Sequence, residues 1–104
     1  MREKIKEAVL KIAEEMELGI SKIILFGSRA RNEATKWSDW DILVVVKGEI
    51  SREKKWEFAR RIRKECAREL IDVEPFIKSE KELEHCADIP GHIVKTALKE
   101  GVVL

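Results

Sequence analysis

The stretch of sequence that decides the fold is FGSRARNEATKWSDWDILVVV, from Phe26 to Val46. It joins the end of one apolar strand to a polar segment and then to a second strand, expected over residues 39–46. Alternate side chains of a strand share a face, so Asp39 and Asp41 project in the same direction. The aliphatic residues that follow them predict a strand that is buried on both faces except at its acidic start.

These two aspartates need a compensating positive charge if the start of the strand is partly buried, because like charges repel and resist removal from water. Mg²⁺ is bound by a few carboxylates and completes its shell with water and phosphate oxygens. Asp39 and Asp41 therefore suggest a divalent cation site. The alternative is that both acids lie at an exposed strand start, where they are solvated or paired with arginine.

Gly27-Ser28 ends the first strand and opens a segment, residues 28–34, that is compatible with a helix. Free backbone N–H groups and the Ser28 hydroxyl can hold a phosphate at a helix N-terminus, and the glycine allows close approach. Taken alone, Gly-Ser after a strand is also a common turn. The sequence has neither a glycine-rich dinucleotide loop nor a lysine-containing P-loop, which excludes the commonest nucleotide-binding architectures.

The remaining chain alternates between helical and extended patterns. An apolar stripe predicts an amphipathic helix over residues 2–18, with Gly19 as its left-handed cap. Strands are expected over residues 22–26 and 71–77, and residues 102–104 can add a last one. This alternation favours an α/β (α+β) fold, with a small mixed or parallel sheet of three to four strands flanked by helices.

A long helix is expected from a cap at Ser51 to about residue 70. Its predicted inner face consists of Trp56, Ala59, Ile62, Cys66 and Leu70. Its basic residues, of which the densest run spans residues 60–68, are expected on the outside. Such a face is usually solvated, and the alternative is a docking surface for an acidic partner.

Several residues near the end of the chain carry positional meaning. Pro75 cannot donate a backbone hydrogen bond and indicates a sheet edge or a strand end. Ser79 and Glu82 have the spacing of a capping box and predict a short helix after the third strand. Another helix is expected to begin at Pro90 and to end at Gly101.

Length and composition limit the kind of protein this is. The 104 residues, 44% hydrophobic and 39% charged, suit a single compact domain over residues 1–104. Lys+Arg 21 against Asp+Glu 20 leaves a net charge of +1, which argues against general nucleic-acid binding. The longest apolar run is too short for a membrane span and no signal peptide is evident, so we expect a cytoplasmic protein. Cys66 and Cys86 lack metal-ligand spacing and are expected to be reduced thiols.

The motif residues together resemble a known family. Gly27-Ser28, Ala30-Arg31 and Ser38-Asp39-x-Asp41, followed by aliphatic residues, resemble the signature of the minimal nucleotidyltransferase (MNT) domains. These domains are the small branch of the polymerase-β-like nucleotidyltransferase superfamily. The resemblance extends over nearly the whole chain, up to residues 99–104. It implies a nucleotidyltransferase fold, two Mg²⁺ ions, ATP as substrate, and transfer of AMP to an acceptor hydroxyl with release of pyrophosphate.

The resemblance also implies roles for particular residues. The implied nucleotide-binding residues are Gly27, Ser28, Arg31 and Ser38. The implied catalytic and metal-binding residues are Asp39, Asp41 and Asp72. Asn32 stands where the family often has glycine and Trp40 lies between the two aspartates, but neither departure removes a ligand.

Two acids are candidates for the third carboxylate, because both share one face of the predicted third strand. Asp72 is flanked by aliphatic residues as the family pattern requires, and it would act on the acceptor hydroxyl. Glu74 is the alternative, although it lies further along the strand and is followed by Pro75.

The resemblance suggests a partner as well. A single small domain has no second module to hold a large acceptor, which favours a protein as the acceptor. MNT domains resemble one half of two-component modules whose other half is a small helical HEPN toxin, which the MNT antitoxin adenylylates. We therefore expect a HEPN-domain partner. The alternative is a non-catalytic antitoxin or scaffold that neutralises its partner by binding, with a vestigial or sensory nucleotide site.

Overall fold

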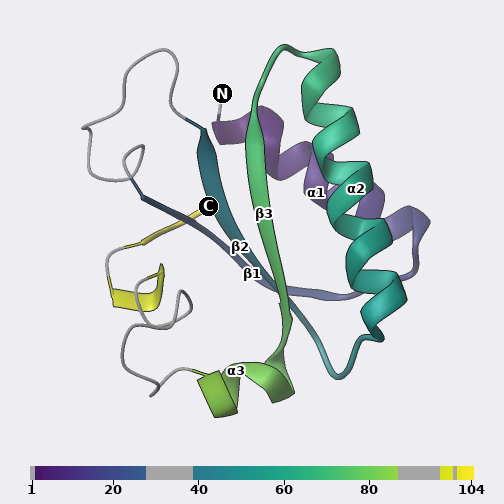
Figure 1. Cartoon of the computed structure of the whole chain (residues 1–104), viewed down its shortest axis with the longest axis vertical. Helices are drawn as coiled ribbons and strands as arrows, with labels where there is room; N and C mark the ends of the chain where they lie inside the picture. Colours follow the sequence, from purple (N-terminus) through teal and green to yellow (C-terminus); the bar gives the residue numbers. More distant parts are fainter. Residues whose placement is uncertain (1, 28–38, 87–96, 100) are drawn as a thin grey trace.

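The computed structural model describes residues 2–27, 39–86, 97–99 and 101–104. Its elements, in chain order, are α1 (Arg2–Glu15), β1 (Ile20–Phe26), β2 (Trp40–Val46), α2 (Arg52–Arg68), β3 (Val73–Ser79), α3 (Glu80–Cys86) and β4 (Val102–Val103), as labelled in Figure 1. The four strands form one sheet in the order β3-β2-β1-β4. β1 is antiparallel to β2 and β4, and β2 is parallel to β3. The predicted mixed sheet of three to four strands flanked by helices is confirmed.

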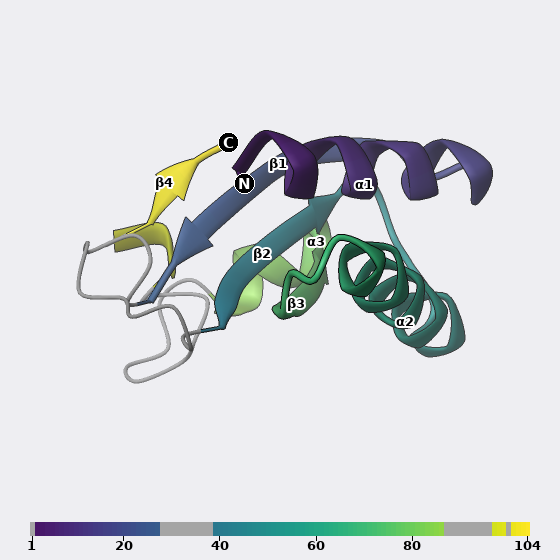
Figure 2. The same ribbon diagram turned by 90° about the horizontal axis from the view of Figure 1, so that it is seen from above.

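The sheet has a different cover on each face. Figure 2 shows α1 and α2 together on one side of the sheet and α3 on the other. The larger apolar cluster joins α1 and α2 to alternate strand residues such as Ile23, Ile42 and Val44. The smaller cluster, on the opposite face, contains Leu43 and Phe26. β2 is therefore buried on both faces, as its continuous aliphatic run predicts.

The inner face of α2 differs from the predicted one. The buried residues are Phe58, Ile62 and Cys66, which follow one another at four-residue spacing. Trp56 is 66% exposed because it lies two residues before Phe58, about 200° around the helix. Leu70 is 93% exposed and has φ +59, so the helix has already ended there. The prediction was wrong for Trp56 and Leu70, and right for Ile62, Cys66 and the partly buried Ala59, which packs against the larger apolar cluster.

The cap of α1 also differs from the predicted one. The left-handed residue is Glu17, with φ +57, and not Gly19. The Leu18 N–H donates to the carbonyl oxygen of Ala13 at 2.8 Å, a pattern that closes a helix around a left-handed residue. The helix therefore ends at Glu15, three residues earlier than predicted.

Three other sequence signals are confirmed. The Ser51 hydroxyl accepts a hydrogen bond from the Lys54 N–H at 3.2 Å and caps α2. Ser79 and Glu82 form the predicted capping box: the Glu82 N–H donates to the Ser79 hydroxyl, and the Ser79 N–H donates to the Glu82 carboxylate. Pro75 lies in β3, the edge strand, where a missing backbone donor does least harm. The predicted helix start at Pro90 lies outside the described residues, but residues 97–99 are helical and precede Gly101.

No helix in the described part of the chain is long and apolar enough to cross a membrane.

Candidate functional site

The candidate site lies at one end of the sheet, where β1 ends and where β2 and β3 begin. Antiparallel pairing places Phe26, the last residue of β1, opposite Asp41 near the start of β2. The Trp40 N–H donates to the carbonyl oxygen of Asp72 at 2.9 Å, so the approaches to β2 and β3 are bonded to each other. Figure 1 shows both strands starting at the same end of the sheet. The topology therefore brings together Gly27, the neighbouring Asp39 and Asp41, and Asp72 from three separate parts of the sequence.

Gly27 lies directly against the carboxylate of Asp41. Its φ is +76, and a Cβ atom placed on it would overlap Oδ2 of Asp41. An L-amino acid at this position would meet both an unfavourable backbone conformation and a steric clash. The absence of a side chain at Gly27 therefore leaves the space that the Asp41 carboxylate occupies.

The other two aspartates lie just outside the strands. Asp39 directly precedes β2 and is exposed, and Asp72 directly precedes β3 and is also exposed. Asp41 is inside β2 and half-buried. Trp40 packs against the larger apolar cluster, so Asp41, the next residue of β2, projects from the face opposite α1 and α2. The shared face predicted for Asp39 and Asp41 stays a prediction, because Asp39 lies outside β2.

Glu74 shows a relationship that the sequence did not reveal. It is the register partner of Asp41 on the neighbouring strand, so these two carboxylates are cross-strand neighbours. Glu74 Oε1 also lies 2.9 Å from Nη2 of Arg63, which belongs to α2. Arg63 is one of several basic residues along α2, and nothing in the sequence distinguishes it from the others.

The donor set fits a Mg²⁺ ion whose shell is completed by substrate. Carboxylate oxygens are the ligands this cation prefers, and Mg²⁺ keeps several positions for water and phosphate oxygens. Because Gly27 has no side chain, its backbone lies bare beside the Asp41 carboxylate at this end of the sheet. Among the described residues, no three His, Cys, Asp or Glu side chains already form a metal-binding cluster. The assignment of Asp39, Asp41 and Asp72 as metal ligands remains a prediction.

Ser28, Arg31 and Ser38, the other predicted nucleotide-binding residues, lie outside the described part of the chain. They belong to the segment between Gly27 and Asp39, and both of these residues lie at the site. Their roles stay predictions.

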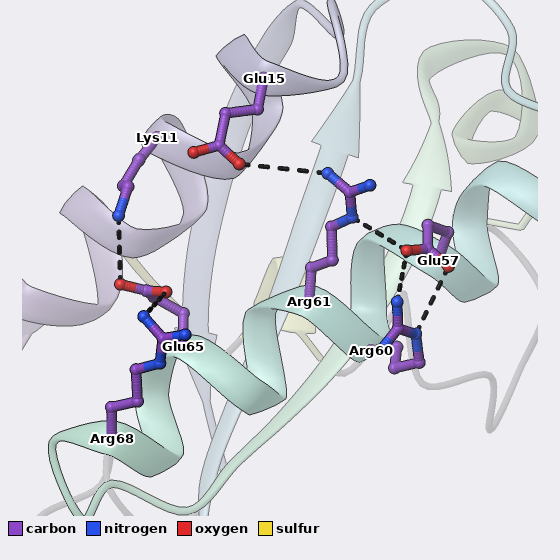
Figure 3. Close-up of polar contacts among 7 residues, drawn as sticks. All are labelled: Lys11, Glu15, Glu57, Arg60, Arg61, Glu65 and Arg68. Atoms are coloured by element: carbon purple, nitrogen blue, oxygen red, sulfur yellow. Dashed lines mark hydrogen bonds and ion pairs between the residues drawn. The ribbon is translucent and has the colours of Figure 1, made fainter.

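The basic run on α2 is largely engaged in ion pairs. Glu57 pairs with Arg60 at 2.6 Å and with Arg61 at 2.9 Å. Glu65 pairs with Arg68 on the same helix and with Lys11 on α1. Figure 3 shows these contacts, together with the approach of Arg61 to Glu15 of α1. Most charges of the run are therefore paired with acids of the protein itself, which supports the interpretation as a solvated surface over a docking surface.

Comparison with known proteins identifies the family. Residues 3–104 match the model of the nucleotidyltransferase domain family, so the chain belongs to this family. No curated protein matches the chain.

Solved structures show the same fold. A protein from Sulfolobus solfataricus that is assigned as a nucleotidyltransferase is 24% identical, with a TM-score of 0.63 over 97% of this chain and 78% of that one. A toxin–antitoxin complex with AMP-PNP is 20% identical, with a TM-score of 0.56 over 93% and 69%. The complex of the tri-AMPylated Shewanella oneidensis HEPN toxin with MNT antitoxin is 19% identical, with a TM-score of 0.50 over 99% and 71%. The predicted nucleotidyltransferase fold is confirmed.

Proposed function

We propose that this protein is a Mg²⁺-dependent nucleotidyltransferase that moves AMP from ATP to a hydroxyl group of a HEPN-domain partner. The observation that carries the proposal is the close approach of Gly27 to Asp41 at the end of the sheet where Asp39 and Asp72 also lie. A bare backbone beside a carboxylate is a suitable place for a triphosphate and its cation. The nucleotidyltransferase family and the toxin–antitoxin structures of the same fold support it.

The residues divide the work of the reaction. Gly27, with Ser28, Arg31 and Ser38, binds the triphosphate and aligns its α-phosphate with the acceptor. Asp39 and Asp41 hold the metal, and Asp72 shares in this and accepts the proton of the acceptor hydroxyl. When bound, Mg²⁺ neutralises the charge of the triphosphate and of the departing pyrophosphate.

Transfer is tested by incubating the protein with Mg²⁺, ATP labelled at the α-phosphate, and a HEPN-domain protein that binds it. Label in the partner supports the proposal. A matched reaction with ATP labelled at the γ-phosphate should leave the partner unlabelled, because that phosphate departs in pyrophosphate. A stable, unlabelled complex in both reactions would show that the protein neutralises its partner by binding alone.

Nucleotide binding is tested separately by calorimetry. We expect ATP to bind more tightly with Mg²⁺ than without it, and equal affinity in both conditions would contradict the metal site. Ser28→Ala should weaken ATP binding by about 1 kcal/mol, the size of one hydrogen bond. If this variant instead lost cooperative unfolding, Ser28 would be a structural cap and not a phosphate ligand.

A further inference from the structure

Asp41 and Glu74 face each other across the parallel pair of strands β2 and β3. Two residues further along, Leu43 lies in the smaller apolar cluster and Phe76 packs against it. Side chains two residues apart share a face of a strand, so Asp41 and Glu74 project from this same face. Directly opposed like charges are unfavourable in a sheet, so such a pair calls for a compensating cation.

Arg63 supplies that cation to Glu74 from outside the sheet. The Arg63 and Glu74 side chains are joined at 2.9 Å and are 52% and 44% exposed. α2 packs on the face opposite the acids, but β3 is the edge strand, so an arginine of α2 can reach Glu74 around that edge. Figure 2 shows α2 beside β3. The contact therefore pairs the Glu74 carboxylate with a guanidinium that comes from another element and not from β2.

Stability does not account for this contact. Ion pairs between exposed side chains contribute little to folding. Arg60 and Arg68 pair with acids of their own helix, whereas Arg63 reaches an acid beside the candidate metal ligands.

We propose that Arg63 is a positioning residue that holds Glu74 out of the metal-binding set, leaving Asp72 as the third ligand beside Asp39 and Asp41. This inference rests on the proposed function. Without Arg63, Glu74 is a flexible carboxylate on the same face as Asp41 and can join the cation as an additional ligand. Additional carboxylates tighten divalent cation binding and displace the water and phosphate that Mg²⁺ needs.

The test measures Mn²⁺ affinity and not catalysis. Mn²⁺ is titrated, by paramagnetic resonance of the free ion, into protein saturated with an ATP analogue whose α–β bridge is a methylene group. We expect Arg63→Ala to bind Mn²⁺ at least about threefold more tightly, and Glu74→Gln alone to stay within about twofold of the wild type. The double variant Arg63→Ala/Glu74→Gln should return to within about twofold of the wild type.

Two controls separate positioning from charge. Arg60→Ala removes one positive charge from the same helix, but the partner of Arg60 is Glu57 and not Glu74, so it should leave Mn²⁺ affinity unchanged. Arg63→Lys keeps the charge and can keep the pair, so it should behave as the wild type.

Each outcome has one meaning. If the tighter binding of Arg63→Ala persists in the double variant, or if Arg60→Ala reproduces it, the effect is one of charge and the inference is overturned. An unchanged Arg63→Ala, or a Glu74→Gln variant that loses Mn²⁺ in the wild-type background, also overturns it while leaving the proposed function standing. If the wild type binds no Mn²⁺ with the analogue present, the proposed function and the inference fail together.

Discussion

The carboxylate of Asp41 occupies the position where a residue other than glycine would place its Cβ atom at position 27. The end of β1 and the start of β2 therefore pack closely, because Gly27 has no side chain where the Asp41 carboxylate lies. Glycine is thus required at position 27 for packing against Asp41, in addition to the phosphate binding that the sequence suggests.

Replacing Gly27 by alanine should lower the free energy of unfolding through both strain and overlap. Gly48 is a matched control, because it has φ +73 and nothing within 4 Å of its would-be Cβ atom. We expect Gly48→Ala to cost about 1 kcal/mol and Gly27→Ala about 2–3 kcal/mol in denaturant unfolding. Equal losses would show that the Asp41 carboxylate moves aside without cost. In Gly27→Ala/Asp41→Ala the difference from Gly48→Ala should largely disappear.

The corrected inner face of α2 can be tested with two aromatic residues. Phe58 is fully buried, so Phe58→Ala should lower the free energy of unfolding by about 3–5 kcal/mol. Trp56 is exposed and contacts the guanidinium of Arg60 at 5.8 Å from the ring centroid, so Trp56→Ala should cost no more than about 1 kcal/mol. If Trp56→Ala lowered the free energy of unfolding more than Phe58→Ala, the inner face predicted from the sequence would be the correct one.

The metal ligands should separate activity from stability. Asp39→Asn and Asp41→Asn should each reduce AMP transfer by roughly 1000-fold or more, since a metal site supplies several kcal/mol in the transition state. Their metal-free forms should unfold at or above the wild-type temperature, because one of two neighbouring negative charges is removed. The exposed Glu14→Gln is the control for loss of a surface charge. A loss of about 0.5–2 kcal/mol in both aspartate variants would instead indicate structural caps.

The third acid is tested in the same series. Asp72→Asn should abolish transfer and keep much of the ATP affinity, because its proposed role is on the acceptor side. Glu74→Gln should remain active. If Asp72→Asn were active and Glu74→Gln inactive, the third acid would be Glu74, and the argument that both acids share one face would still hold. If both variants were active, the proposed mechanism would be ruled out.

The buried thiol of Cys66 gives a prediction that depends on pH. Burial, with a smaller contribution from Glu65, raises the pKa of Cys66 from 9.0 to about 11. In a Cys86→Ser background, Cys66 should therefore react slowly with an alkylating reagent at pH 8 and rapidly once the protein is unfolded. Because the folded state resists ionisation of this thiol, the free energy of unfolding should fall as pH rises from 9.0 to about 11. Fast alkylation of the folded protein would mean that α2 opens readily.

Much of this arrangement follows from local patterns in the sequence. The aliphatic run after Asp41, together with Trp40 before it, predicts both the strand and the face from which Asp41 projects, because a strand has a period of two. The face of α2 was harder to predict, since Trp56 and Ala59 have the spacing of an apolar helical stripe, yet only Ala59 packs against the core. The aromatic residue that is buried is Phe58. The contact of Arg63 with Glu74 could not be predicted, because it depends on how α2 crosses the edge of the sheet and not on spacing.

The edge position of β3 has a consequence for how the protein loses activity on heating. β2 is held between two neighbouring strands, whereas β3 is the terminal strand of the sheet and pairs with β2 on one side. Terminal strands open in local fluctuations that need less free energy than complete unfolding. A molecule in which the start of β3 has frayed still carries Asp39 and Asp41 but no longer presents the third acid, whether that is Asp72 or Glu74. The upper temperature of catalysis is then set by the fraying of a single strand, below the temperature at which the whole domain melts.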